Sequence, residues 1–252
     1  MSGHSKWSTI KRQKGANDAK RGQAFTKAGR AITIAAKEGG GNPDANFKLR
    51  LAIEAARAIN MPKDNIDRAV SRATGEGSEK ALEEVTYEGF GPAGVALIIE
   101  VVTDNKMRSA SDVRSTLDRN NGNLAGPGSV AYLFKPKGEL VVNLSEKDPD
   151  ELFLLAADSG AEDIDTHGEE ATIFSSPEQL LKVKEAVEKE GYLVVSSEVV
   201  KEPTTTVKIT QDSQAKSVLS LVEKLEELDD VQKVYANFDI SEEMLEENME
   251  VS

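Results

Sequence analysis

Apolar residues in the first third of the chain recur at helical spacing. The pattern predicts helices over about residues 17–37, 43–59 and 62–73. Positions in a helix rotate by about 100° per residue, so apolar residues three or four apart share a face. In the first helix that face comprises Phe25, Ile32 and Ala36. The opposite side carries a stripe of cations, namely Lys20, Lys27, Arg30 and Lys37. We expect one face to pack and the other to present positive charge.

Glycine and proline mark the ends of these helices. The glycines at 39–41 end the first helix, and Asn42 before Pro43 predicts a cap and a first position for the second. Pro62 opens the third helix in the same way. The N-terminal segment is therefore expected to be a small helical domain.

From about Val85 the period changes to that of strands alternating with helices. Two separate parts of the chain each predict strand, helix and strand. The first part has these elements at 95–102, 107–117 and 130–134, and the second has them at 207–209, 218–228 and 231–238. The two parts are interrupted by a third pattern of elements.

Residues 139–200 carry a β-α-β-β-α-β order of their own, which is typical of a ferredoxin-like domain. Two stretches, Asp148-Pro149 and Ser176-Pro177, predict helix caps followed by proline at the first helical position. The predicted elements are, in order, 140–144, 149–158, a strand near 164, 171–174, 178–189 and 192–195.

These patterns predict an α+β fold in which an N-terminal helical domain precedes two ferredoxin-like α/β sandwich domains, one inserted in the other. The outer halves are otherwise too far apart in sequence to form one sheet. The predicted segments are a basic helical domain at 1–76, a discontinuous domain at 77–135 and 203–240, an inserted acidic domain at 136–202, and an acidic tail at 241–252. The tail is either a short acidic helix or a frayed end.

Charge is distributed unevenly along the chain. Its 252 residues include 31 Lys and Arg against 44 Asp and Glu, a net charge of −13 that argues against a polyanionic partner. Residues 1–72, however, hold 15 basic and 6 acidic side chains and carry +9, whereas 73–135 carry −3 and 136–252 carry −19. This asymmetry indicates a module that meets a polyanion, although cations also simply solvate helix faces.

Composition excludes several classes of protein. The chain has no cysteine, which excludes disulfide scaffolds, thiolate metal sites and cysteine nucleophiles, and fits a reducing cytoplasmic compartment. The longest apolar run, 152–157, is far shorter than the roughly 20 residues of a membrane helix. We therefore expect a soluble cytoplasmic protein with no membrane partner.

Catalytic chemistry has little support in the sequence. His4 and His167 are the only histidines, and neither has metal-ligand or nucleophile–base spacing. Residues 89–94 match the dinucleotide-binding string G-x-G-x-x-G, but that loop must lead into a helix, and here it leads into a predicted strand. A tight turn between two strands explains these glycines better. An enzyme is therefore less favoured than a nucleic-acid-binding protein.

Several short motifs occur in one order along the chain. They are Gly3-His4-Ser5-Lys6-Trp7, Asp18-Ala19-Lys20-Arg21-Gly22, Asn60-Met61-Pro62-Lys63-Asp64-Asn65-Ile66, Tyr87-Glu88-Gly89-Phe90-Gly91-Pro92 and Gly128-Ser129-Val130-Ala131-Tyr132-Leu133-Phe134. Together these motifs resemble the YebC-like family. The resemblance is strong over about the first 135 residues and rests on the domain pattern beyond them.

The resemblance implies a regulator of gene expression with no enzyme activity and no cofactor. The family contains bacterial proteins described as probable transcriptional regulators and a mitochondrial branch that activates translation. Our leading hypothesis is a DNA-binding transcriptional regulator of the YebC type. The alternative is a ribosome-associated translation factor that binds ribosomal RNA.

In both hypotheses the N-terminal domain contacts phosphates. The candidate residues are Lys6, Trp7, Lys11, Arg12, Lys14, Lys20, Arg21, Lys27, Arg30 and Lys37. Trp7 either stacks on an exposed base or pins the N-terminal arm to the helical bundle, and we favour pinning. Arg50 and Arg57 are ambiguous between phosphate contact and a solvated face.

Overall fold

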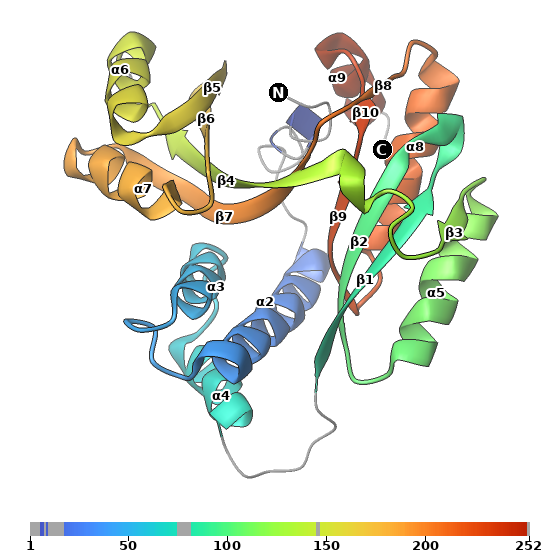
Figure 1. The fold of residues 1–252 in the computed structure, drawn as a ribbon, viewed down its shortest axis with the longest axis horizontal. Coiled ribbons are helices and arrows are strands. Elements are labelled where there is room, and N and C mark those ends of the chain that lie inside the picture. The colour runs from blue at the N-terminus through green and yellow to red at the C-terminus, as the bar shows by residue number, and fades with distance from the viewer. Residues whose placement is uncertain (1–5, 8, 10–17, 75–81, 145–146, 251–252) are drawn as a thin grey trace. The chain divides into compact units, whose positions relative to one another are not determined.

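The computed structural model describes residues 6–7, 9, 18–74, 82–144 and 147–250. The backbone separates into two compact units, of which unit 1 is residues 1–134 with 203–252 and unit 2 is residues 135–202 (Figure 1). The fold is α+β, with a helical N-terminal region and mainly antiparallel strand pairing, so the predicted fold class is confirmed. The boundaries of the four predicted segments stay predictions.

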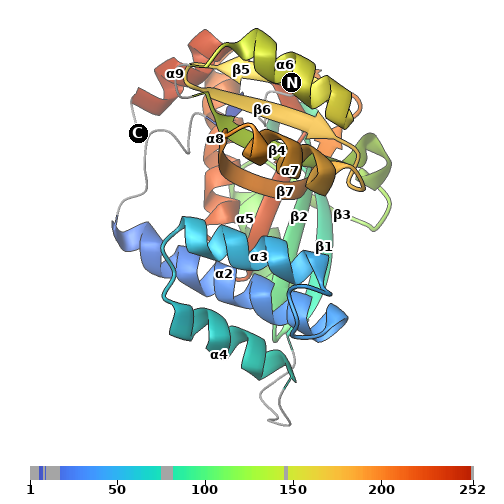
Figure 2. The same ribbon diagram turned by 90° about the vertical axis from the view of Figure 1, so that its left-hand side faces the viewer.

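The N-terminal region of unit 1 contains three helices that pack around one core (Figure 2). They are α2 (Asp18–Gly39), α3 (Phe47–Ala58) and α4 (Lys63–Thr74). Ile32 and Ala36 lie in this core as the periodicity predicted, with Phe25 partly buried against it. Helix α3 contributes Leu49 and Ile53 to the same core.

The second helix begins later than predicted, and the cap at Asn42 is wrong. Asn42 Oδ1 accepts from Asp44 N at 3.0 Å, which closes a turn before the helix. The cap is Asn46, whose Oδ1 accepts from Leu49 N at 3.1 Å. The Asn46 amide also donates to the Ala35 and Gly40 carbonyls at 2.7 and 2.8 Å, so this buried side chain ties the end of α2 to the start of α3.

Unit 1 also contains a four-stranded sheet in the order β3-β1-β2-β9. Helices α5 and α8 supply most of the apolar side chains that pack with it. The strands are β1 (Glu83–Phe90), β2 (Ala96–Thr103), β3 (Asn123–Ala125) and β9 (Val231–Ala236), and the helices are α5 (Lys106–Arg119) and α8 (Asp212–Glu226). Strand β2 is nearly continuous in its burial, as its apolar run predicted.

This sheet differs from a regular ferredoxin-like sheet in one strand. Strand β8 (Val207–Lys208) would be expected between β2 and β3, but it pairs in parallel with β10 (Phe238–Asp239) in a separate two-stranded sheet. Strand β1 takes its place, because a tight turn joins β1 to β2 and the two pair along their whole length, from Glu83 with Thr103 to Phe90 with Ala96.

The predicted strand over residues 130–134 is wrong. Ala131–Leu133 forms the short 3-10 helix η2, and the strand β4 (Phe134–Asn143) starts only where η2 ends. The backbone N–H groups of Val130 and Ala131 donate to the Glu88 carboxylate at 2.7 and 2.9 Å. These donors are therefore satisfied without a neighbouring strand.

The glycine-rich stretch 89–94 is a turn between two strands, as predicted. It contains the short 3-10 helix η1 (Pro92–Gly94) and leads directly into β2. Gly91 N donates to Val95 O at 2.8 Å across the turn, and Gly94 has a φ of +77°, a conformation that glycine adopts without strain. The stretch does not open a helix that could hold a pyrophosphate group.

Unit 2 has the β-α-β-β-α-β order that the sequence predicted, with sheet order β5-β6-β4-β7. Besides β4 it comprises α6 (Pro149–Ser159), β5 (Ala161–His167), β6 (Glu170–Ser175), α7 (Leu180–Lys189) and β7 (Leu193–Pro203). Asp148 caps α6 by accepting from Asp150 N at 2.9 Å, as predicted. The predicted cap at Ser176 is wrong, because α7 starts at Leu180, after a turn.

The last described residues form a helix, α9 (Glu242–Glu250). Leu245 is fully buried in the core of unit 1, and the Asn248 amide donates to Asp212 Oδ1 at 2.9 Å. The alternative of a frayed end is therefore wrong for this stretch. None of the helices in the described part of the chain is both long and apolar enough to cross a membrane.

Candidate nucleic-acid interface

Helix α2 carries the predicted cationic stripe, and Lys27 of this stripe, with the neighbouring Gln23, binds backbone carbonyls at the end of α8. The Lys27 ammonium donates to Glu226 O. One turn earlier, the Gln23 amide donates to Glu227 O at 2.5 Å. The C-terminal carbonyls of a helix lack intrahelical donors and carry the negative end of its dipole, so they attract a cation. Part of the stripe is therefore an internal contact within unit 1.

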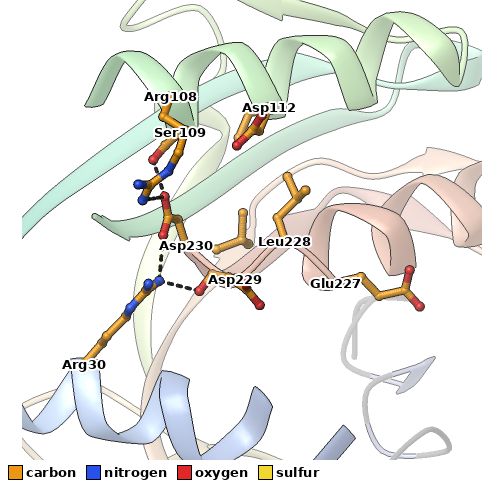
Figure 3. Close-up of a pocket in the computed structure, with 10 residues that line it drawn as sticks. Arg30, Arg108, Ser109, Asp112, Glu227, Leu228, Asp229 and Asp230 are labelled. Atoms are coloured by element: carbon orange, nitrogen blue, oxygen red, sulfur yellow. Dashed lines mark hydrogen bonds and ion pairs between the residues drawn. The ribbon is translucent and has the colours of Figure 1, made fainter. Parts of the chain in front are cut away.

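Arg30 extends this contact into the turn between α8 and β9. Its Nη1 donates to Asp229 O and lies 2.7 Å from Asp230 Oδ1 (Figure 3). It also donates to Val102 O of β2 at 3.3 Å. Helix α2 is thereby attached to strand β2 and to the α8–β9 turn through one guanidinium group.

Asp230 is the centre of a polar cluster. Its second oxygen, Oδ2, accepts from Ser109 Oγ at 2.6 Å, from Arg108 Nη2 at 2.7 Å and from Thr103 Oγ1 at 3.0 Å. Burial acts to raise the pKa of Asp230, but these hydrogen bonds and the nearby charge of Arg30 outweigh it and lower the pKa to about 2. Asp230 is therefore a charged structural residue at neutral pH.

A recess of about 490 Å³ lies beside this cluster. Its lining includes two arginines and four carboxylates, and the residues come from α2, α5, the α8–β9 turn and the start of β9 (Figure 3). The charged members are Arg30, Arg108, Asp112, Glu227, Asp229 and Asp230. With more negative than positive groups, the recess is unsuited to a phosphate. Among the described residues there is also no group of three or more metal-ligating side chains.

The remaining predicted site residues lie in different surroundings. Lys37 is exposed and donates to Leu82 O at 3.2 Å, and Lys6 is half-buried. Lys20 and Arg21 belong to α2, but their side chains are outside the described part of the chain. Three further residues, Lys11, Arg12 and Lys14, fall outside the described residues altogether.

Trp7 packs, as we favoured, but not against the helical bundle. Its side chain is 1 % exposed and lies in the core of the sheet with residues such as Leu97 and Leu245. The N-terminal arm is therefore attached to the α/β part of unit 1. A side chain so deeply buried does not offer a face to a base.

Three cations of α3 and α4 are exposed, namely Arg57, Lys63 and Arg72. None of their side chains forms an ion pair or a hydrogen bond with another described residue. Arg50, by contrast, donates to the Pro43 and Asp44 carbonyls and serves the local backbone. Sequence reasoning left Arg57 open and missed the other two. They lie three or four positions from Ile53, Ile66 and Ala69, at the edges of the buried helix faces, so helical spacing alone does not identify them.

Comparison with known proteins covers nearly the whole chain. Residues 5–76 match a family model described as the TACO1/YebC protein N-terminal domain, and residues 82–238 match one described as the TACO1/YebC second and third domain. A crystal structure of a conserved hypothetical protein from Aquifex aeolicus superposes with a TM-score of 0.84 at 43 % identity, covering 89 % of this chain and 93 % of that one.

Curated relatives agree with this assignment. A probable transcriptional regulatory protein of Chloroflexus aggregans is 51 % identical over 249 residues, which is 98 % of each chain. A protein of the same name from Rubrobacter xylanophilus is 50 % identical over 98 % of this chain and 99 % of its own. With both family models matched in order and relatives similar over their full length, the chain belongs to the TACO1/YebC family of regulatory proteins.

Proposed function

We propose that this protein is a non-enzymatic, cytoplasmic regulator of gene expression that binds duplex DNA through its N-terminal segment, residues 1–76. The observation that carries the proposal is the charge of +9 on residues 1–72 in a chain whose total is −13. A cationic segment of this kind neutralises phosphates and releases their counterions, while the acidic remainder is repelled from the polyanion.

The exposed cations of the helical region support this proposal. Arg57, Lys63 and Arg72 are free to contact phosphates, and the basic residues between 6 and 21 add further positive charge. Lys27 and Arg30 have a different role in this proposal, because they hold α2 against the α8–β9 turn. The proposed phosphate-binding set therefore omits Lys27 and Arg30 from the predicted stripe and adds the three exposed cations of α3 and α4.

The names of the relatives, which are probable transcriptional regulatory proteins, support DNA as the first ligand to test. Helix α4 has Asp64 and Asp67 in its first turns, where a recognition helix would approach base edges. We therefore expect affinity to come from phosphates and to depend weakly on sequence.

The test is the salt dependence of binding to a labelled duplex, measured by anisotropy from about 50 to 200 mM salt. If about six phosphates are neutralised, the slope of log K against log salt should be roughly −4 to −5.5. The double variant Lys20→Glu with Arg21→Glu should weaken binding and reduce the magnitude of the slope by about 2.

A matched control is Lys182→Glu with Lys189→Glu, which makes the same charge change at exposed positions of α7. It should leave both the affinity and the slope unchanged. Equal effects of the two double variants, or wild-type binding without salt dependence, would contradict the proposal. Loss of the bound duplex to competitor ribosomal RNA, with co-sedimentation of the protein with ribosomes, would favour the translational hypothesis instead.

A further inference from the structure

The longest stretch of the chain without an acidic residue lies far from the N-terminal segment. It is 119–138, and the next longest are 19–37 and 1–17, both within the proposed DNA-binding segment. Residues 73–252 as a whole carry −22, so a basic stretch there is unexpected. Its described part in unit 1 is residues 119–134. This part contains Arg119 and a largely exposed turn over residues 126–130 that leads into η2. The proposed function does not use this surface.

A buried carboxylate holds the turn in place. Glu88 of β1 is 8 % exposed, and its two oxygens accept from three backbone N–H groups of the turn. The donors are Gly128 N at 2.6 Å, Val130 N at 2.7 Å and Ala131 N at 2.9 Å. Hydrogen bonds to a charged acceptor are stronger than neutral ones, so the backbone of the turn is well ordered. Two of the motifs that resemble the YebC-like family meet at this contact.

The other end of η2 is held as well. Leu133 O accepts from Thr204 N at 2.7 Å and from Thr204 Oγ1 at 3.0 Å. The short helix Ala131–Leu133 is therefore anchored on both sides, by Glu88 before it and by Thr204 after it. A side chain on this helix has little backbone entropy to lose on binding.

Tyr132 stands on this anchored turn with 73 % of its surface exposed. It is the only large hydrophobic side chain exposed between residues 119 and 134, so the surface offers too little apolar area for a protein interface. An exposed aromatic ring on a stretch that carries Arg119 and no acidic residue instead suits a nucleobase, because each base has a face for stacking.

We propose that Tyr132 stacks on an unpaired base of the nucleic acid and that Glu88 is the positioning residue that presents it. This inference rests on the proposed function, because the N-terminal segment supplies the phosphate contacts that bring the nucleic acid to the protein. The turn then adds a preference for sites where a base is unstacked, such as a hairpin loop or a bulge. Arg119 and the exposed amide groups of Asn121 and Asn123 provide polar groups on the same stretch.

The experiment measures binding of the full chain to two probes of equal length, a hairpin with an unpaired loop and a fully paired duplex. Tyr132→Ala should weaken hairpin binding by roughly 5- to 100-fold, because stacking contributes at this level for each base. It should leave duplex binding and the salt slope unchanged. Tyr132→Phe keeps the ring and should bind both probes as the wild type does.

Two further variants make the test specific. Met107→Ala removes another highly exposed apolar side chain of unit 1 and should change neither affinity. Glu88→Gln weakens the support of the turn and should reduce hairpin binding selectively, as Tyr132→Ala does. Thermal unfolding of Tyr132→Ala should match the wild type, since the side chain is exposed.

The inference is overturned if Tyr132→Ala binds the hairpin within twofold of the wild type while the N-terminal charge variants still weaken binding. It is also overturned if Tyr132→Ala weakens both probes equally. Failure of the wild type to bind either probe would instead refute the proposed function, and this inference with it.

Discussion

Arg30 on the first long helix and Asp230 near the end of the chain form an ion pair of 2.7 Å across 200 positions of sequence. The pair brings a residue predicted to bind phosphate onto a carboxylate of the protein itself. Because Lys27 and Gln23 bind the adjacent carbonyls of α8, the contact is a continuous strip along α2. It attaches the helical region to the sheet within unit 1.

Replacing Asp230 should therefore cost stability. In Asp230→Asn the guanidinium groups of Arg30 and Arg108 lose the carboxylate that they share, although Arg108 keeps Asp104 at 2.8 Å, and we expect the free energy of unfolding to fall by about 1–3 kcal/mol. Urea unfolding followed by circular dichroism would measure this. Asp112→Asn, an exposed acid beside the same recess, is the matched control and should change stability by less than about 0.5 kcal/mol. Equal losses in both variants would contradict the role assigned to Asp230.

The lowered pKa of Asp230 also predicts a pH dependence. Burial opposes the shift, but the hydrogen bonds from Ser109, Arg108 and Thr103 lower the pKa from its ordinary value of 3.8 to about 2. A carboxyl with a lower pKa in the folded state adds stability that is complete above its unfolded pKa and is lost as pH falls through the folded one. The stability difference between wild type and Asp230→Asn should thus shrink from pH 5 towards pH 2. A difference that stays constant over this range would contradict the assignment.

Trp7 is the only tryptophan of the chain, so its fluorescence reports on one site. Because the ring is buried in the core of the sheet, its emission should be blue-shifted, weakly quenched by acrylamide, and unchanged when nucleic acid binds. Trp7→Ala should lower the free energy of unfolding by about 3–5 kcal/mol, as expected for a large core side chain. Strong quenching on addition of nucleic acid would indicate stacking instead.

The buried cap of α3 gives a further test. Asn46→Ala removes the hydrogen bonds to Leu49 N and to the Ala35 and Gly40 carbonyls, and should cost about 1–3 kcal/mol. Asn42→Ala removes one bond in an exposed turn and should cost less than about 1 kcal/mol. Thermal unfolding of the two variants side by side would measure the difference. A larger loss of stability in Asn42→Ala than in Asn46→Ala would contradict this assignment and support Asn42 as the cap.

Local patterns predicted the elements well where burial follows periodicity. The buried face of α2, with Ile32 and Ala36, and the continuous burial of β2 both follow from spacing alone. The sequence order of unit 2 also predicted its ferredoxin-like sheet, because consecutive elements with short connections leave few arrangements.

Contacts between residues far apart in the sequence account for what local patterns missed at residues 130–134 and at Arg30. Val130 and Phe134 resemble strand residues, but the backbone N–H groups of Val130 and Ala131 donate to Glu88, which lies more than 40 positions earlier in the sequence. Likewise, nothing near Arg30 in the sequence indicates that Asp230 is its partner. Side chains that satisfy remote backbone or charged groups leave no periodic signal, so their roles required the structure.

The most direct test of the central claim is a map of crosslinks between the protein and nucleic acid in cells, read by mass spectrometry of the crosslinked peptides. We predict that most crosslinks fall within residues 1–76, that Tyr132 forms a second site, and that the acidic segment 136–202 is almost free of crosslinks. Crosslinks concentrated in residues 136–202, with few in the N-terminal segment, would contradict it.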